Sequence, residues 1–169
     1  MVTEWPQFFT ATILQWRPLL APDKYKDIVI AALRFLVKDK RAKVYSFAVM
    51  VNHIHIIWQV QPATTPAALQ RDFLKYIAQR IKADLERYHP EQLAAFRVPA
   101  KDRICQFWKQ NALSIELRSH RVFLQKLEYI HQNPVKAGLC RLPEEYKYSS
   151  ASFYDSGIDY WGFLCHYFE

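Results

Sequence analysis

The chain has 169 residues, a length typical of one domain that folds without disulfides or metal. Hydrophobic residues make up 51% and charged residues 23%, which excludes a disordered chain. The formal net charge is +7, and 15% of the residues are aromatic. This combination is typical of nucleic-acid-binding proteins, because cations contact phosphates and flat rings stack on bases, but it also occurs in unrelated basic enzymes.

Cysteine usage and hydropathy indicate the compartment. Cys105, Cys140 and Cys165 are odd in number and widely spaced, which predicts neither a disulfide framework nor a zinc ribbon. The most apolar run, residues 28–37, contains Arg34 and is too short to span a bilayer. The N-terminal residues lack the pattern of a secretory signal. We therefore expect a cytoplasmic protein that does not contact a membrane.

Residue patterns in the first half predict three strands and a helix. Aromatic and β-branched residues predict a strand at 8–15, and apolar residues at three- and four-residue steps predict a helix over 22–38, with Pro22 in its first turn. Two further strands, 44–50 and 53–60, are separated by so few residues that we expect a tight antiparallel hairpin.

The second half predicts two helices, two short strands and a tail. In order, these are a helix at 67–88, strands at 104–108 and 112–117, a helix at 119–133, and an aromatic-rich tail at 135–169 that packs on the domain. Ser119 is suited to cap the last helix, and Pro134 predicts its end. The order of elements predicts a single domain over residues 1–169 with an α+β, ferredoxin-like or RRM-like fold. We expect an antiparallel sheet with its helices on one face and the other face free for a ligand.

The third predicted strand carries two histidines. Side chains alternate along a strand, so His53 and His55 share one face while Ile54 lies on the other. Their Cα atoms are expected to be roughly 6.5–7 Å apart, close enough for both rings to reach one cation. Such a pair also arises by chance on a solvated strand, and a metal site needs a third ligand.

The last predicted helix offers that ligand. Tyr129 and Asn133 are four residues apart and therefore share a face. Laid across the sheet, this helix would bring the Asn133 amide oxygen toward the histidines and place the Tyr129 hydroxyl beside them. From the residues alone, Tyr129 is better interpreted as one of ten tyrosines, half-buried with its hydroxyl in water.

Longer motifs resemble a known family. The run Val51–Trp58 resembles the histidine–hydrophobe–histidine (HUH) motif of single-tyrosine transposases, and Leu127–Leu139 resembles the catalytic-tyrosine segment of their REP-associated branch. Glu145–Ala151 and Phe107–Gln110 resemble two further elements of that branch, in the same order. The similarity extends from about residue 8 to residue 155. One departure is Val51, where the family usually has a proline that would fix the hairpin bend.

The resemblance implies an enzyme that nicks and rejoins single-stranded or hairpin DNA through a 5′-phosphotyrosine. Tyr129, on a helix of the C-terminal half, would be the nucleophile. His53, His55 and Asn133 would hold a divalent cation, Mg²⁺ or Mn²⁺. Such an enzyme is expected at the nucleoid, as a monomer or homodimer.

Basic residues near the expected site are candidates for DNA contacts: Lys109, Arg118, Arg121, Lys126 and Lys136. Three alternative functions stay open. The chain could bind hairpin DNA or RNA without cleaving it, it could be another HUH enzyme such as a replication initiator or relaxase, or it could be a metal-dependent hydrolase that uses water as nucleophile.

Overall fold

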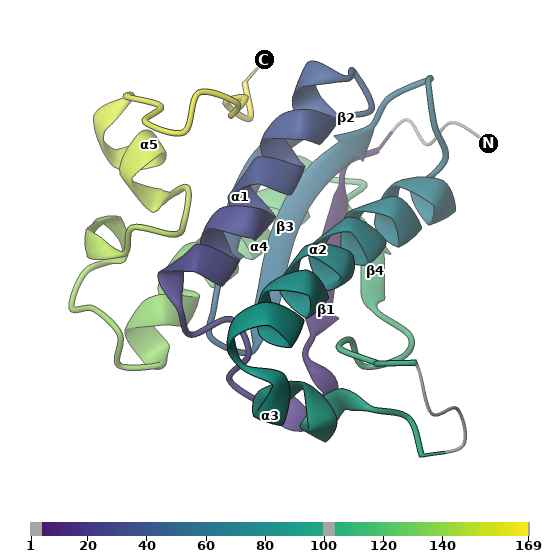
Figure 1. Cartoon of the computed structure of the whole chain (residues 1–169). Coiled ribbons are helices and arrows are strands. Elements are labelled where there is room, and N and C mark those ends of the chain that lie inside the picture. The colour runs from purple at the N-terminus through teal and green to yellow at the C-terminus, as the bar shows by residue number, and fades with distance from the viewer. Residues whose placement is uncertain (1–4, 100–103, 169) are drawn as a thin grey trace.

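The computed structural model describes residues 5–99 and 104–168 (Figure 1). The helices and strands, in chain order, are β1 (Gln7–Thr12), α1 (Asp23–Lys38), β2 (Ala42–Val49), β3 (His53–Val60), α2 (Pro66–Tyr88), α3 (Pro90–Leu93), β4 (Leu113–Glu116), α4 (His120–Lys136) and α5 (Ala151–Ser156). The strands form one four-stranded sheet in the order β2-β3-β1-β4, and every neighbouring pair is antiparallel. The predicted α+β class and antiparallel sheet are confirmed.

One face of the sheet is covered by α1 and α2, which lie side by side in front of the sheet in Figure 1. Strand alternation supplies the core of this layer, because Ile54, Ile56 and Trp58 of β3 all point into it. The Trp58 ring stacks on Phe9 of β1 at a centroid distance of 5.0 Å. This core fixes which residues of β3 are left for the opposite face.

The opposite face is not free, and the expectation that all helices lie on one side is wrong for α4. Helix α4 packs across β2 and β3, burying Phe123, Leu127 and Ile130 against Tyr45 and Ile57. The apolar stripe on α4 requires burial, and Ile57 interrupts the polar face of β3 to receive it. The face that carries the histidines is therefore partly covered by α4.

Two predicted strands differ from the observed structure. The strand predicted at 8–15 ends at Thr12, because Gln15 and Trp16 adopt positive φ angles of 56° and 57° in a short 3-10 turn. The strand predicted at 104–108 is wrong, since the segment forms only isolated bridges, including one from Trp108 to Ile13. The other predicted helices and strands begin and end within two residues of their expected bounds, except α4, and the short helices α3 and α5 were not predicted.

Helix α4 continues through Pro134 to Lys136 instead of ending at Asn133. Pro134 has no N–H to donate within the helix, and a hydrogen-bonded C-terminal motif closes the helix directly after it. Gly138 has a φ of 75°, its N–H donates to the carbonyl of Val135, and the N–H of Leu139 donates to the carbonyl of Pro134. Asn133 is thereby held in regular helix, one turn after Tyr129.

The hairpin between β2 and β3 turns at Val51 and Asn52. No proline is needed there, because the chain after β1 holds both carbonyls. The N–H of Leu20 donates to the carbonyl of Val51 at 2.9 Å, and the N–H of Ile13 donates to the carbonyl of Asn52 at 2.8 Å. This contact fixes the position of the residue just before His53.

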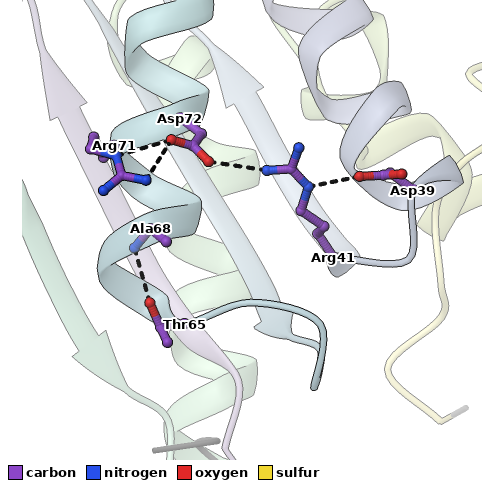
Figure 2. A network of polar contacts seen from close by, with 6 residues as sticks. All are labelled: Asp39, Arg41, Thr65, Ala68, Arg71 and Asp72. Atoms are coloured by element: carbon purple, nitrogen blue, oxygen red, sulfur yellow. Dashed lines mark hydrogen bonds and ion pairs between the residues drawn. The ribbon is translucent and has the colours of Figure 1, made fainter.

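Polar contacts hold the ends of the layers together. Figure 2 shows Arg41, at the start of β2, between Asp39 and Asp72, with nitrogen–oxygen distances of 2.8 Å and 3.1 Å. This network joins the end of α1 to α2. At the outer edge of β2, the C-terminal segment forms bridges from Ser149 to Ala48 and from Leu164 to Val44. No helix among the described residues is long and apolar enough to cross a membrane.

Candidate active site

The two histidines of β3 lie on the face that α4 covers. His53 and His55 have ring centroids 4.7 Å apart, and His55 is buried with 4% of its surface exposed. Cross-strand pairing places Thr10 of β1 beside His55 on one side and Ala48 of β2 on the other. His55 is thus at the centre of the sheet, under the edge of α4.

Helix α4 brings Tyr129 and Asn133 to these histidines. The Asn133 Oδ1 atom lies 3.0 Å from His53 Nε2, and the Tyr129 ring lies edge-on to His55 at a centroid distance of 5.3 Å. Tyr129 keeps 43% of its surface exposed, so its hydroxyl is open to a ligand from solvent. The four residues that the sequence singles out as catalytic or metal-binding are therefore adjacent in space, although 80 residues separate His53 from Asn133.

Each histidine is oriented through its Nδ1 atom by a neighbour that the sequence did not indicate. Thr10 Oγ1 lies 2.8 Å from His55 Nδ1, and Asn52 Oδ1 lies 2.7 Å from His53 Nδ1. Asn52 could have been found as the residue before the motif. Thr10 could not, since its role depends on the pairing of β1 with β3.

The donor set fits a divalent cation. Both ring nitrogens of His53 face an amide oxygen, and a neutral imidazole has only one N–H, so one nitrogen lone pair must face an acceptor. With the proton on Nδ1, the two acceptors are Nε2 and the Asn133 oxygen, which lie 3.0 Å apart. A cation between them, or rotation of the Asn133 amide, satisfies both atoms. Two adjacent ligands of an octahedral ion with bonds of about 2.1 Å are about 3 Å apart, which matches this separation.

The neighbouring histidine supplies a second observation. His55 Nε2 is buried and has no hydrogen-bond partner among the described residues. Such an atom is costly unless a ligand or water reaches it. Burial, followed by the electrostatic influence of His53 and of the Lys126 ammonium, lowers the pKa of His55 to about 3, so its ring is neutral. Burial also lowers the pKa of His53, against a smaller opposing effect of the Asn133 contact.

Neutral imidazoles and an amide oxygen would form an incomplete coordination shell. Within residues 5–99 and 104–168, no three His, Cys, Asp or Glu side chains gather in a way that could hold a metal ion. The three donors here are two histidines and an asparagine, so positions are left for water and for oxygens of a substrate. This arrangement suits catalytic Mg²⁺ or Mn²⁺ better than a closed structural zinc site.

The five basic residues predicted to contact DNA are placed differently. Lys126 reaches the site and Lys136 lies on the same stripe of α4, since positions 126, 129, 133 and 136 repeat at helical spacing. Lys109 lies over the Trp16 ring at the end of β1 near His53, and Arg121 lies on the first turn of α4. Arg118 is paired with Glu116 at 2.6 Å, so its charge is partly neutralised.

An apolar surface continues from the site across β1 and β4. Leu113 pairs with Thr10, and Ile115 pairs with Phe8, so these side chains share the histidine face beyond the cover of α4. They are 50% and 37% exposed. The open side of the site is therefore lined by apolar residues on which a flat group can pack.

Comparisons with known proteins agree with the architecture. A solved REP-associated tyrosine transposase, bound to a REP hairpin, has a TM-score of 0.70 with 16% sequence identity, covering 97% of this chain and 87% of that one. A candidate transposase from Deinococcus radiodurans has a TM-score of 0.47 with 13% identity, covering 77% and 92%. No protein-family model and no curated sequence matches the chain. At such identities the first likeness establishes a shared fold.

Proposed function

We propose that this chain, which has the fold of a REP-associated tyrosine transposase, nicks and rejoins DNA with Tyr129 as nucleophile. The observation that carries the proposal is the meeting of Tyr129 with His53, His55 and Asn133 at one open position. A hydroxyl nucleophile beside a neutral, incomplete cation site is suited to attack a phosphodiester.

The proposed step exchanges one phosphorus–oxygen bond for another. The Tyr129 phenolic oxygen bonds to phosphorus as the bond from phosphorus to the 3′ oxygen breaks. The phenolic proton passes to water, and the leaving 3′ oxygen takes a proton from water, which gives a 5′-phosphotyrosine and a free 3′-OH. Because the phosphotyrosine keeps the energy of the phosphodiester, attack by a 3′-OH reverses the step without ATP.

The chain's residues would supply position and charge. His53, His55 and Asn133 would hold Mg²⁺ or Mn²⁺, which when bound neutralises charge on the phosphate oxygens. Thr10 and Asn52 keep the ring nitrogens directed at that position. The packing of α4 on β2 and β3 fixes the height of Tyr129 above the sheet.

The partner we propose is single-stranded or hairpin DNA. A net charge of +7 attracts a polyanion, and the exposed Leu113 and Ile115 beside the site can pack against unpaired bases. The related fold in complex with a REP hairpin supports hairpin DNA in particular. A duplex would present its bases stacked and paired, out of reach of this surface.

A covalent adduct tests the proposal. End-labelled hairpin oligonucleotides from the DNA flanking the gene are incubated with the protein and Mn²⁺ or Mg²⁺, and products are separated on denaturing gels. We expect a protein–DNA band that EDTA abolishes and that is absent from Tyr129→Phe and His55→Ala. Tyr160→Phe, at a tyrosine that is 75% exposed and outside the site, is the matched control and should keep full activity.

The other outcomes identify the alternatives. Cleavage that survives Tyr129→Phe would make water the nucleophile and the chain a metal-dependent hydrolase. Tight, metal-independent binding with no adduct from the wild type would make it a recognition module.

A further inference from the structure

Lys126 lies closer to the candidate nucleophile than a general DNA contact requires. Its Nζ atom is 5.5 Å from the Tyr129 ring centroid and 4.8 Å from that of Phe8. Phe8 is buried and stacks on His55, with ring centroids 5.5 Å apart. The ammonium group therefore lies over the rings of Phe8 and Tyr129, which both contact His55 at the site.

The charge of Lys126 is not used by the protein. In the described part of the chain its ammonium has no ion pair and no hydrogen bond, only the two aromatic contacts. The nearest acid along the helix, Glu128, accepts a hydrogen bond from Gln132 instead. By contrast, Arg118 and Arg41 are both paired with carboxylates. Three N–H donors of Lys126 are thus available for a ligand.

The aromatic contacts hold the ammonium in place before a ligand arrives. A cation over ring faces is attracted by the ring quadrupole, and the half-buried methylene stem of Lys126 restricts its motion. Its field reaches the site, since it is one of the causes that lower the pKa of His55. A positioned charge next to the reacting atoms stabilises a transition state more than a mobile one does.

We propose that the Lys126 ammonium binds a non-bridging oxygen of the scissile phosphate and neutralises the charge that grows there as Tyr129 attacks. This inference rests on the proposed function. It makes Lys126 a catalytic residue rather than one of several backbone contacts. No proton moves to or from Lys126 in the step, because the ammonium acts as a hydrogen-bond donor and a fixed charge.

The test separates charge from packing. Lys126→Met keeps an unbranched stem over Phe8 and removes the charge. At saturating DNA, we expect its single-turnover rate of adduct formation to fall about 100-fold, the size seen when one preorganised donor is lost. Lys75→Met, at an exposed lysine of α2 on the opposite side of the sheet, is the matched control and should change neither this rate nor DNA affinity. DNA affinity is measured by fluorescence anisotropy in EDTA.

A substrate whose scissile phosphate is replaced by a neutral group tests whether Lys126 acts on the phosphate charge. With a methylphosphonate at the scissile position, one charged oxygen is replaced by a methyl group, so wild type and Lys126→Met should react at nearly the same rate. If the wild type does not cleave this substrate, added methylammonium should restore activity to Lys126→Ala on normal DNA.

Two results would overturn the assignment: an unchanged rate on normal DNA, or an equal loss on both substrates. If Lys126→Met reacts at the wild-type rate but binds DNA more weakly in EDTA, Lys126 contacts the DNA backbone and does not assist the reaction. The failures are distinguishable, since a wild type that forms no adduct contradicts the proposed function itself, whereas a wild-type adduct with a fully active Lys126→Met contradicts only this inference.

Discussion

At the scale of single residues, the candidate site depends on which nitrogen of each imidazole contacts a neighbouring side chain and which is left for a ligand. Nδ1 of His55 is held by Thr10 and Nδ1 of His53 by Asn52, which leaves both Nε2 atoms for the shared space. Outer partners of this kind fix the tautomer and the ring orientation of metal-binding histidines. Thr10 is thus as important to the proposed cation site as a ligand, although it would not touch the ion.

Removing the Thr10 hydroxyl should weaken metal use without unfolding the protein. In Thr10→Val the Nδ1 atom of His55 loses its partner, so we expect the Mn²⁺ concentration for half-maximal adduct formation to rise about 10- to 100-fold. Metal titrations of the adduct assay, together with calorimetric binding of Mn²⁺, measure this. Thr12→Val on the same strand is the control, because the Thr12 hydroxyl forms no hydrogen bond among the described residues. If the wild type, Thr10→Val and Thr12→Val all need the same Mn²⁺ concentration, Thr10 has no role in the proposed cation site.

At the scale of elements, the position of α4 is set from below by the sheet and from the side by the C-terminal segment. The Nε2 atom of His131 lies 2.7 Å from the Ser150 hydroxyl and 3.3 Å from that of Ser46, all three residues being buried. Although His131 is close to Tyr129 in the chain, it points away from the site. Its pKa is lowered to about 4 by burial, so it is a neutral contact between elements.

Breaking this contact should cost stability. Ser150→Ala leaves the buried His131 without its shortest hydrogen bond and also removes the bond from the Phe47 N–H to the Ser150 hydroxyl. We expect the free energy of unfolding to fall by about 1–3 kcal/mol, as for other buried groups left unpaired. Urea denaturation followed by circular dichroism measures it. Ser152→Ala, at a half-buried serine two residues later, should change stability little, and a similar loss in both variants would contradict the assigned role.

At the scale of the whole molecule, buried phenols connect the layers. Tyr25 donates to Asp84 between α1 and α2, Tyr148 donates to Asp27 on α1, and Tyr146 donates to the carbonyl of Val49 at the end of β2. Burial, with the bonded carboxylates at Tyr25 and Tyr148, raises the pKa values of these hydroxyls, that of Tyr146 to about 12. Burial raises the pKa of the Tyr154 hydroxyl as well.

These shifts predict a loss of stability in alkali. A folded pKa above the ordinary value of 10.0 means that the stabilisation is complete below about pH 10 and is lost as the pH rises through the folded values. Urea denaturation at pH 8 and pH 11 should therefore show a lower free energy of unfolding at pH 11. The difference should shrink in Tyr146→Phe and stay unchanged in Tyr160→Phe, whose phenol is exposed. A pH-independent free energy over this range would contradict the prediction.

Most helices and strands, and four side chains of the candidate site, could be predicted from local patterns. Alternation along 53–60 put both histidines on one face, and four-residue spacing put Tyr129 and Asn133 on one stripe, because these periodicities are local properties of strands and helices. The surroundings of these side chains depend on contacts between distant segments. Thr10 contacts His55 because β1 pairs with β3, although the two residues are 45 positions apart. Helix α4 packs on the second face of the sheet because Ile57 and Tyr45 form an apolar surface there. Helix α4 also continues through Pro134, against the local preference of proline, and is closed by hydrogen bonds from the N–H groups of Gly138 and Leu139. Which face a helix covers, and which hydroxyl reaches a ring nitrogen, depends on contacts between distant segments, and these form only when the whole chain packs.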